Sequence, residues 1–157
     1  MSTFEIFQAV QDSSFGHFIG HQSHWVGAVV QMFHIAGLIS LLAGILLVSL
    51  RLLGVGLHTA PLTRLASAAT PLIATGAVLL LVSGLFIFIP SATLYAPNPA
   101  FWAKVVLLLA ALIVHFTLYR KATASDSPNP TLARFAGVLS ISLWFSVGFA
   151  GRAIGFM

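Results

Sequence analysis

Residues 25–50, WVGAVVQMFHIAGLISLLAGILLVSL, form an apolar run in which His34 is the only ionisable side chain. A helix needs about 20 apolar residues to cross the hydrocarbon core of a bilayer. This run is long enough, and it is bounded by Trp25 at one end and by Arg51 just after the other, as is typical of membrane interfaces. It predicts a transmembrane helix. Three further runs predict the remaining spans, at about 70–89, 99–119 and 132–151.

The composition agrees with a membrane protein. Of the 157 residues, 59% are hydrophobic and 6% are charged, whereas a soluble domain carries about 25% charged residues. This excludes a soluble enzyme, a nucleic-acid-binding domain and a disordered chain. Because the loops are short, consecutive helices should pack as antiparallel neighbours. The expected fold is all-α: a four-transmembrane-helix bundle formed by residues 25–157.

Residues 1–24 are expected to form a separate N-terminal segment. They lack the basic stretch of a signal peptide, and polar residues interrupt their apolar positions. Phe4, Phe7 and Val10 recur at helical spacing. This spacing predicts a short amphipathic helix over residues 3–11 that lies on the membrane interface.

The charged residues predict the orientation. Five basic residues lie in or beside the loops that join spans one to two and three to four: Arg51, Arg64, Arg120, Lys121 and Arg134. The opposite side has only Lys104 and Arg152. By the positive-inside rule, the chain is a multi-pass protein of the bacterial inner membrane with both termini on the periplasmic side.

Several chemistries are excluded by the residues that the sequence lacks. With no cysteine, the chain can form no disulfide, no thiolate metal site and no covalent c-type haem attachment. No Asp or Glu lies within a predicted span, which argues against a carboxylate proton relay. The sequence also lacks the motifs of phosphate-binding loops and hydrolases. An autonomous enzyme is therefore not expected.

Two histidines lie at membrane depth, His34 in span one and His115 in span three. Ionisable residues there are costly and are functional candidates, and neutral imidazole is a common ligand of haem iron. We therefore expect the two to be axial ligands of a non-covalent haem b. Counted from Trp25 and Trp102, however, their depths differ by about 6 Å, and by more when counted from the other ends. The alternative is that each histidine hydrogen-bonds to a neighbouring helix.

Three other residues could support such a site. Lys104 and Arg152 lie near the outer ends of their spans and could together hold an anionic group, such as a haem propionate or a lipid phosphate. Extension of both side chains to the interface is the alternative. Gln31 lies one turn before His34 and could orient its ring.

A second group of histidines precedes span one. His17, His21 and His24 have the spacing i, i+4, i+7, which would place them on one face of a helix. Such spacing can bind zinc or copper. One of them could also supply the second ligand of a haem near the outer face, and ordinary interfacial histidines are the third interpretation.

Small residues predict where helices approach closely. In spans one and four these are Gly37, Gly44, Gly137, Gly148, Gly151 and Gly155.

Four stretches of the chain carry a family resemblance. They are QMFHIAG (31–37), VSLRLLG (48–54), NPAFWAK (98–104), and SISLW (140–144) with GRAI (151–154). In this order they resemble an uncharacterised bacterial family of four-helix membrane proteins with the pattern E-x-x-H-x-x-G, D-L-R-L-L-G, N-x-x-F-x-x-K and G-R-x-I.

That family is similar in layout to copper-resistance D and cytochrome b561-like proteins, and the resemblance implies a redox or metal-related role. It places His34, Arg51, Lys104 and Arg152 on motif positions. Gln31 and Ser49 replace the acidic residues of the pattern, which puts in doubt any role that needs a carboxylate.

The expected function is that of a b-type cytochrome-like electron-transfer subunit within a larger membrane redox complex. It would pass electrons between a partner at the outer face and a quinone or another haem. A cofactor-free accessory or anchor subunit is the first alternative, and a copper-handling membrane protein is the second. The expected partners are the lipid bilayer and other subunits, not nucleic acid.

Overall fold

The computed structural model describes residues 2–56 and 59–156. Its four long helices are α3 (His24–Leu52), α4 (Leu62–Phe88), α6 (Pro99–Val114) and α8 (Pro130–Ala153). Together with short helical continuations of α4, α6 and α8, they are long and apolar enough to cross a membrane. The all-α prediction is confirmed for the described residues, and the four candidate spans agree in number with the four predicted ones, as in a multi-pass membrane protein.

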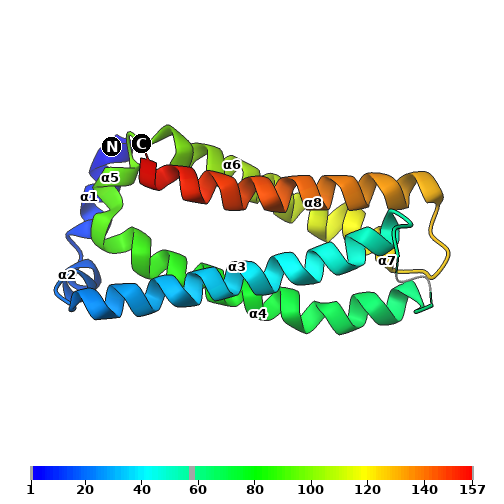
Figure 1. Cartoon of the computed structure of the whole chain (residues 1–157). Helices are drawn as coiled ribbons and strands as arrows, with labels where there is room; N and C mark the ends of the chain where they lie inside the picture. The colour runs from blue at the N-terminus through cyan, green and yellow to red at the C-terminus, as the bar shows by residue number, and fades with distance from the viewer. Residues whose placement is uncertain (1, 57–58, 157) are drawn as a thin grey trace.

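The four helices form two layers, α6 with α8 and α3 with α4 (Figure 1). Helix α3 packs against both α4 and α8, and α8 packs against α6. Both chain termini lie at one end of the bundle (Figure 1), which we call the terminal end. The segments 53–56, 59–61 and 124–129 lie at the opposite end, which we call the loop end (Figure 1).

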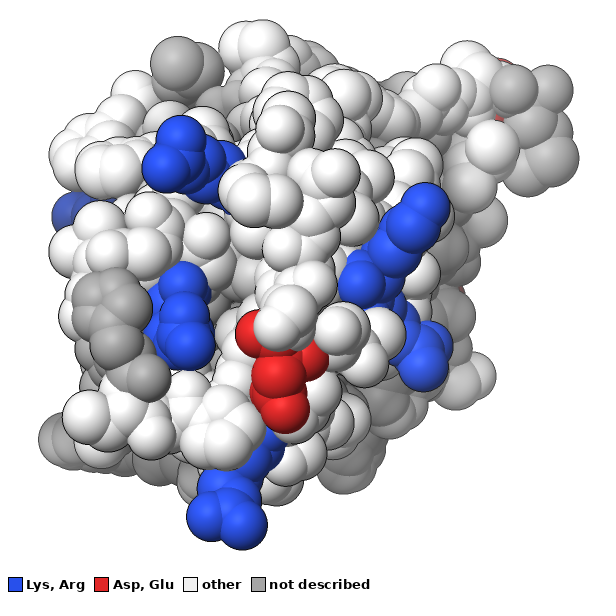
Figure 2. Space-filling view, turned by 90° about the vertical axis from the view of Figure 1, so that its right-hand side faces the viewer, with Lys and Arg blue, Asp and Glu red and all other residues white. Residues whose placement is uncertain are grey.

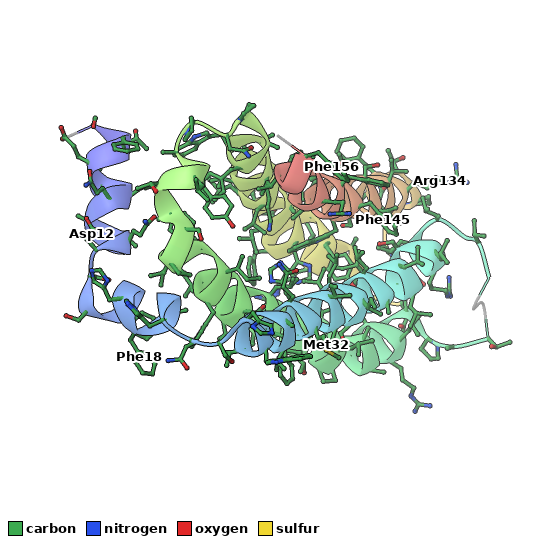
Figure 3. All side chains as sticks on the ribbon, turned by 60° about the vertical axis from the view of Figure 1, so that its left-hand side comes forward. Asp12, Phe18, Met32, Arg134, Phe145 and Phe156 are labelled. Carbon is green, nitrogen blue, oxygen red and sulfur yellow. The ribbon has the colours of Figure 1, made fainter. Side chains whose placement is uncertain are left out.

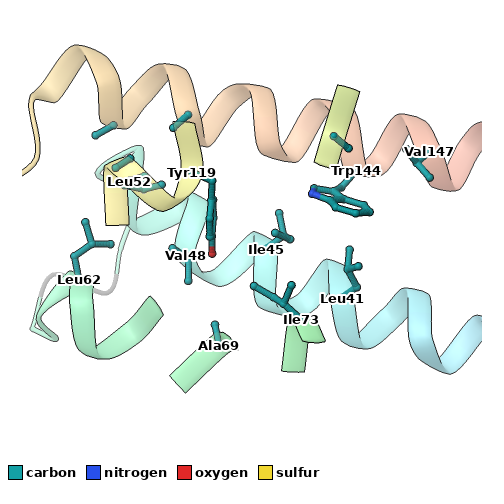
Figure 4. Close-up of a cluster of buried hydrophobic side chains, with 14 residues drawn as sticks. Leu41, Ile45, Val48, Leu52, Leu62, Ala69, Ile73, Tyr119, Trp144 and Val147 are labelled. Atoms are coloured by element: carbon teal, nitrogen blue, oxygen red, sulfur yellow. The ribbon is translucent and has the colours of Figure 1, made fainter. Parts of the chain in front are cut away.

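The core follows one face of α3. Leu41, Ile45 and Val48 are almost inaccessible there and belong to one buried cluster with Tyr119 and Trp144 (Figure 4). The outward faces carry large apolar side chains, such as Phe149, which is 75% exposed. Such a surface suits contact with lipid rather than with water.

Glycines let the backbones of α3, α4 and α8 meet, as the small-residue pattern predicted. A Cβ atom on Gly76 of α4 would lie 2.6 Å from the backbone oxygen of Gly37 in α3. A Cβ on Gly137 of α8 would lie 3.1 Å from the backbone oxygen of Ser49. Close packing of small residues is a common way for membrane helices to associate.

The ends of the spans differ from the predicted ones. Helix α4 begins at Leu62, eight residues before the predicted start at 70. Its first two turns are partly polar, and Asp126 accepts a hydrogen bond from the backbone nitrogen of Thr63 there. After Phe88 the chain continues through η1 (Ile89–Ser91) and α5 (Ala92–Tyr95), so Pro90 does not end the helical path. The third span passes from α6 into the π-helix η2 (His115–Tyr119) and then into α7 (Arg120–Thr123).

The predicted N-terminal helix is present as α1 (Thr3–Gln11), and a second short helix, α2 (Ser14–Gly20), follows it. Asp12 lies in the turn between them (Figure 3). Helix α1 is docked onto the terminal end. The side-chain oxygen of Gln11 accepts hydrogen bonds from the backbone nitrogen and the hydroxyl of Thr93, at 3.0 and 2.8 Å.

Candidate functional site

His34 is fixed by a side-chain hydrogen bond between α3 and α4. Its Nδ1 atom lies 2.8 Å from the hydroxyl oxygen of Ser83. That hydroxyl donates its only proton to the backbone oxygen of Leu79, one turn earlier in α4. With the serine proton on the oxygen of Leu79, the oxygen of Ser83 accepts from an N–H at Nδ1 of His34, which is the tautomer that this arrangement favours. The Nε2 atom then carries the lone pair with which a neutral imidazole binds a metal.

Helix α6 contributes a cation to this site, and helix α8 contributes the glycine on which that cation packs. The His34 ring lies against Gly84, where a Cβ atom would be 3.5 Å from its Cε1. Lys104 of α6 is close enough for its charge to act on the imidazole. The side chain of Lys104 lies over Gly151 of α8, with Nζ 3.3 Å from the position of a Cβ on that glycine. We call this group of His34, Ser83, Gly84, Lys104 and Gly151 the His34 site; each long helix supplies at least one member.

Two predicted members of the site have exposed side chains. Arg152 is exposed, and its guanidinium carbon lies 4.6 Å from the ring centre of Phe156. The labels of Figure 3 place Phe156 at the terminal end and Arg134 at the other end of α8. Gln31 is also exposed, and Ser83 provides the hydrogen bond that orients His34.

His115 occupies a different environment. It is the first residue of the π-helix η2, and its ring stacks on Tyr119 with the ring centres 4.8 Å apart. Its Nδ1 atom is buried and has no hydrogen-bond partner among the described residues. π-Helical turns are rare and are frequently found at functional sites.

The structure does not bring His34 and His115 to one level. The ring of His115 stacks on Tyr119, which lies beside Val48 of α3 in the buried cluster (Figure 4). Val48 follows His34 by 14 residues in the sequence, which is about 21 Å along a helix at 1.5 Å per residue. Two imidazole nitrogens bound to one metal would be about 4 Å apart, because each bond is about 2 Å long. The predicted pairing on one iron is not favoured by this arrangement.

The three outer histidines do not share one helix face. His21 is the C-cap residue just after α2, and a turn leads to Ser23 before α3 begins at His24. The rings of His17 and His21 have their centres 6.1 Å apart, and Nδ1 of His21 is 2.7 Å from the backbone oxygen of His17. In residues 2–56 and 59–156, no three His, Asp or Glu side chains gather in a way that could hold a metal ion.

Ser83 is the site residue that sequence reasoning did not find. A serine in an apolar span is unremarkable, because its hydroxyl usually bonds to the carbonyl four residues earlier. The dipeptide Ser83-Gly84 is the available signal, since it combines a hydroxyl with a position that leaves room for a neighbouring ring.

Comparisons with known proteins place the chain in a family but do not identify an activity. No curated protein and no solved structure matches it significantly. The likeness in layout to copper-resistance D and cytochrome b561-like proteins therefore stays a prediction. A family model matches residues 6–157, almost the whole chain. The chain belongs to DUF6644, a family of unknown function.

Proposed function

We propose that this chain is a membrane-embedded electron-transfer subunit that binds haem b through Nε2 of His34. The observation that carries the proposal is the hydrogen bond from Nδ1 of His34 to Ser83. A metal-bound histidine usually donates its other ring N–H to such a partner, which fixes the tautomer and the ring orientation. Bound haem would supply an iron that carries one electron at a time.

Lys104 is the second residue proposed to act on the haem. It is partly buried, and its side chain packs over Gly151 of α8. Its cationic group could pair with a haem propionate. Arg152, which contacts Phe156, is proposed to play at most a minor part. His115, the first residue of η2, is not favoured as a second ligand, so any second ligand would come from another group.

The proposed setting is a larger complex of the bacterial inner membrane with both termini on the periplasmic side. The chain has short loops and no soluble domain in its described residues, so an electron donor or acceptor would be another subunit or a quinone. The basic residues at the loop end favour this orientation.

A cofactor-free accessory subunit is the second candidate. It is favoured by the hydrogen bond to Ser83 itself, because that bond gives His34 a structural role without any ligand. The copper-handling alternative is less favoured because the described outer histidines do not form a group of metal ligands.

Absorption spectroscopy of the purified protein distinguishes these candidates. The wild-type protein in detergent should show a b-type α band in the reduced-minus-oxidised spectrum, with haem in stoichiometric amount. His34→Ala should lose the haem. His115→Ala is the matched control and should retain it. A colourless wild-type protein without metal would support the accessory subunit, and copper without haem would support the third candidate.

A further inference from the structure

The loop end contains a pocket that the proposed haem site does not use. It has a volume of about 290 Å³ and lies where the end of α3, the start of α4 and the start of α8 meet the segment 124–129. The side chains that matter for its chemistry are Arg51, Arg134, Asp126 and Ser127, with Leu62 and Pro128 as apolar walls.

Two arginines from different helices line this pocket. Arg51 lies in the last turn of α3, and Arg134 follows the first turn of α8. The Nε atom of Arg51 is buried and has no hydrogen-bond partner in the part of the chain that the structure describes. Burying a guanidinium N–H without a partner is unfavourable. Arg51 thus lines the pocket with a guanidinium group that is not fully satisfied by the described residues.

Asp126, the one acidic residue among the described residues that line the pocket, also binds α4. One carboxylate oxygen of Asp126 accepts hydrogen bonds from the backbone nitrogen and the hydroxyl of Thr63, each at 2.8 Å. These bonds satisfy the N-terminal turn of α4, whose N–H groups lack helical partners. The charge of Asp126 still acts on Arg51, but two cations face one carboxylate, so the pocket keeps an excess positive charge.

The surroundings of the pocket add further positive charge. The end view in Figure 2 shows basic side chains gathered around an acidic patch. Arg64 lies in the first turn of α4, and Arg120 and Lys121 lie in α7, so these cations belong to the same end of the bundle. They are exposed, whereas Arg51 is half-buried. A ligand in the pocket would thus be attracted by all these charges and contacted by Arg51 and Arg134.

We propose that this pocket binds the phosphate head group of an anionic membrane lipid. Guanidinium groups bind phosphate oxygens through paired, charge-assisted hydrogen bonds. The pocket lies at the ends of helices that are long and apolar enough to span a bilayer, which is the level of lipid head groups. Pro128 and Pro130 provide apolar contacts for the glycerol part of a lipid. Basic pockets between membrane helices are a known way to recognise such lipids.

Native mass spectrometry of the full chain released from detergent tests this proposal. Dioleoylphosphatidylglycerol should bind at least tenfold more tightly than zwitterionic dioleoylphosphatidylcholine. The double variant Arg51→Gln/Arg134→Gln should lose this preference. The matched control Arg64→Gln/Arg120→Gln removes the same charge at the same end but outside the pocket lining, and it should keep the preference.

A second variant guards against misfolding of the double variant. Ser127→Glu adds a negative charge to the exposed rim of the pocket without removing an arginine, and it should also abolish the preference. Equal losses in the Arg51/Arg134 and Arg64/Arg120 variants would overturn the proposal, since diffuse charge would then explain the binding. It would also be overturned if inorganic phosphate competed with the lipid at equal concentration, which would identify a soluble phosphate as the ligand.

Discussion

The Nδ1 atom of His34 lies 2.8 Å from the hydroxyl oxygen of Ser83, a residue 49 positions later in the sequence. Because the serine proton is given to Leu79, this contact determines which ring nitrogen of His34 is available to a ligand. One hydrogen bond thus links the packing of α3 on α4 to the chemistry of the site.

Ser83→Ala removes the acceptor of the His34 N–H and should weaken haem binding by about 10- to 100-fold, the usual effect of losing a residue that orients a metal ligand. Haem retention during dialysis against apomyoglobin measures this loss. Thr75→Ala is the control, because Thr75 donates to a carbonyl of its own helix and should leave haem binding unchanged. Equal retention in both variants would contradict the assigned role of Ser83.

Lys104→Met should lower the midpoint potential of the bound haem by tens of millivolts. A nearby positive charge favours the reduced iron, which carries one charge less, and its removal favours the oxidised iron. Redox titration followed by absorbance measures the shift. Arg152→Gln removes a cation that is exposed and lies against Phe156, so its effect should be much smaller. A larger shift in the Arg152 variant would contradict the assignment of Lys104 as the main cation of the site and would support the prediction that both cations act on the haem.

Gly76→Ala should destabilise the contact between α3 and α4. The added Cβ would lie 2.6 Å from the backbone oxygen of Gly37 and from the backbone nitrogen of Leu41, and backbone atoms cannot move aside as a side chain can. Overpacking of this kind costs about 1–3 kcal/mol. A lower thermal unfolding midpoint in detergent is the expected result.

Gly27→Ala is the matched control for this glycine. No neighbouring atom lies within 4 Å of a Cβ at Gly27, and alanine favours a helix more than glycine does. Its unfolding midpoint should stay the same or rise. Similar decreases in the two variants would mean that the close approach of Gly37 and Gly76 is not what determines stability.

The fold was largely predictable because apolar length dominates the folding of such a chain. Any run of about 20 apolar residues without charge has to form a helix in a membrane. The start of α4 at Leu62 could not be predicted, because Asp126, which binds Thr63, is 63 residues away in the sequence. The predicted packing of consecutive helices holds for α3 with α4 and for α6 with α8, whereas the contact of α3 with α8 was hidden, since apolar residues cover all faces of the spans.

The site was predictable in part. His34 was recognisable because an ionisable residue at membrane depth is costly, and Lys104 because a cation near the end of a span can hold an anionic group. The separation of His34 and His115 along the bundle could not be read from the sequence, because Trp25 and Trp102 are not reliable markers of equal depth. Trp25 is 70% exposed at the start of α3, nine residues before His34, whereas Trp102 lies only two residues before Lys104. Depth counted from the two tryptophans therefore underestimated the separation of His34 and His115.

Phe7→Ala should release α1 from the terminal end. The Phe7 ring contacts Phe88, Phe101 and Trp102, with ring centres between 5.2 and 6.0 Å apart. Aromatic pairs of this kind contribute about 0.5–1.5 kcal/mol each beyond their buried area. Hydrogen exchange of residues 3–11 should become faster. Phe4→Ala, at a position that is 52% exposed, should leave the exchange rate unchanged, and equal acceleration in both variants would argue against docking through Phe7.

Asp126→Asn should lower stability at neutral pH and make little difference in acid. Hydrogen bonds from the backbone and side chain of Thr63 hold the pKa of Asp126 below its ordinary value. A lowered pKa in the folded state means that the stabilising contribution is fully present above the ordinary pKa of about 3.9. The contribution is lost as the pH falls through the lowered value.

The measurement is the thermal unfolding midpoint of wild type and Asp126→Asn between pH 7 and pH 3. The difference should be largest at pH 7 and should shrink below about pH 4, where the wild-type carboxylate begins to be protonated. Asp12→Asn, at the turn between α1 and α2 (Figure 3), removes an equal charge at the terminal end and should show no such convergence. A constant difference for Asp126→Asn across this range would show that the carboxylate charge does not stabilise the start of α4.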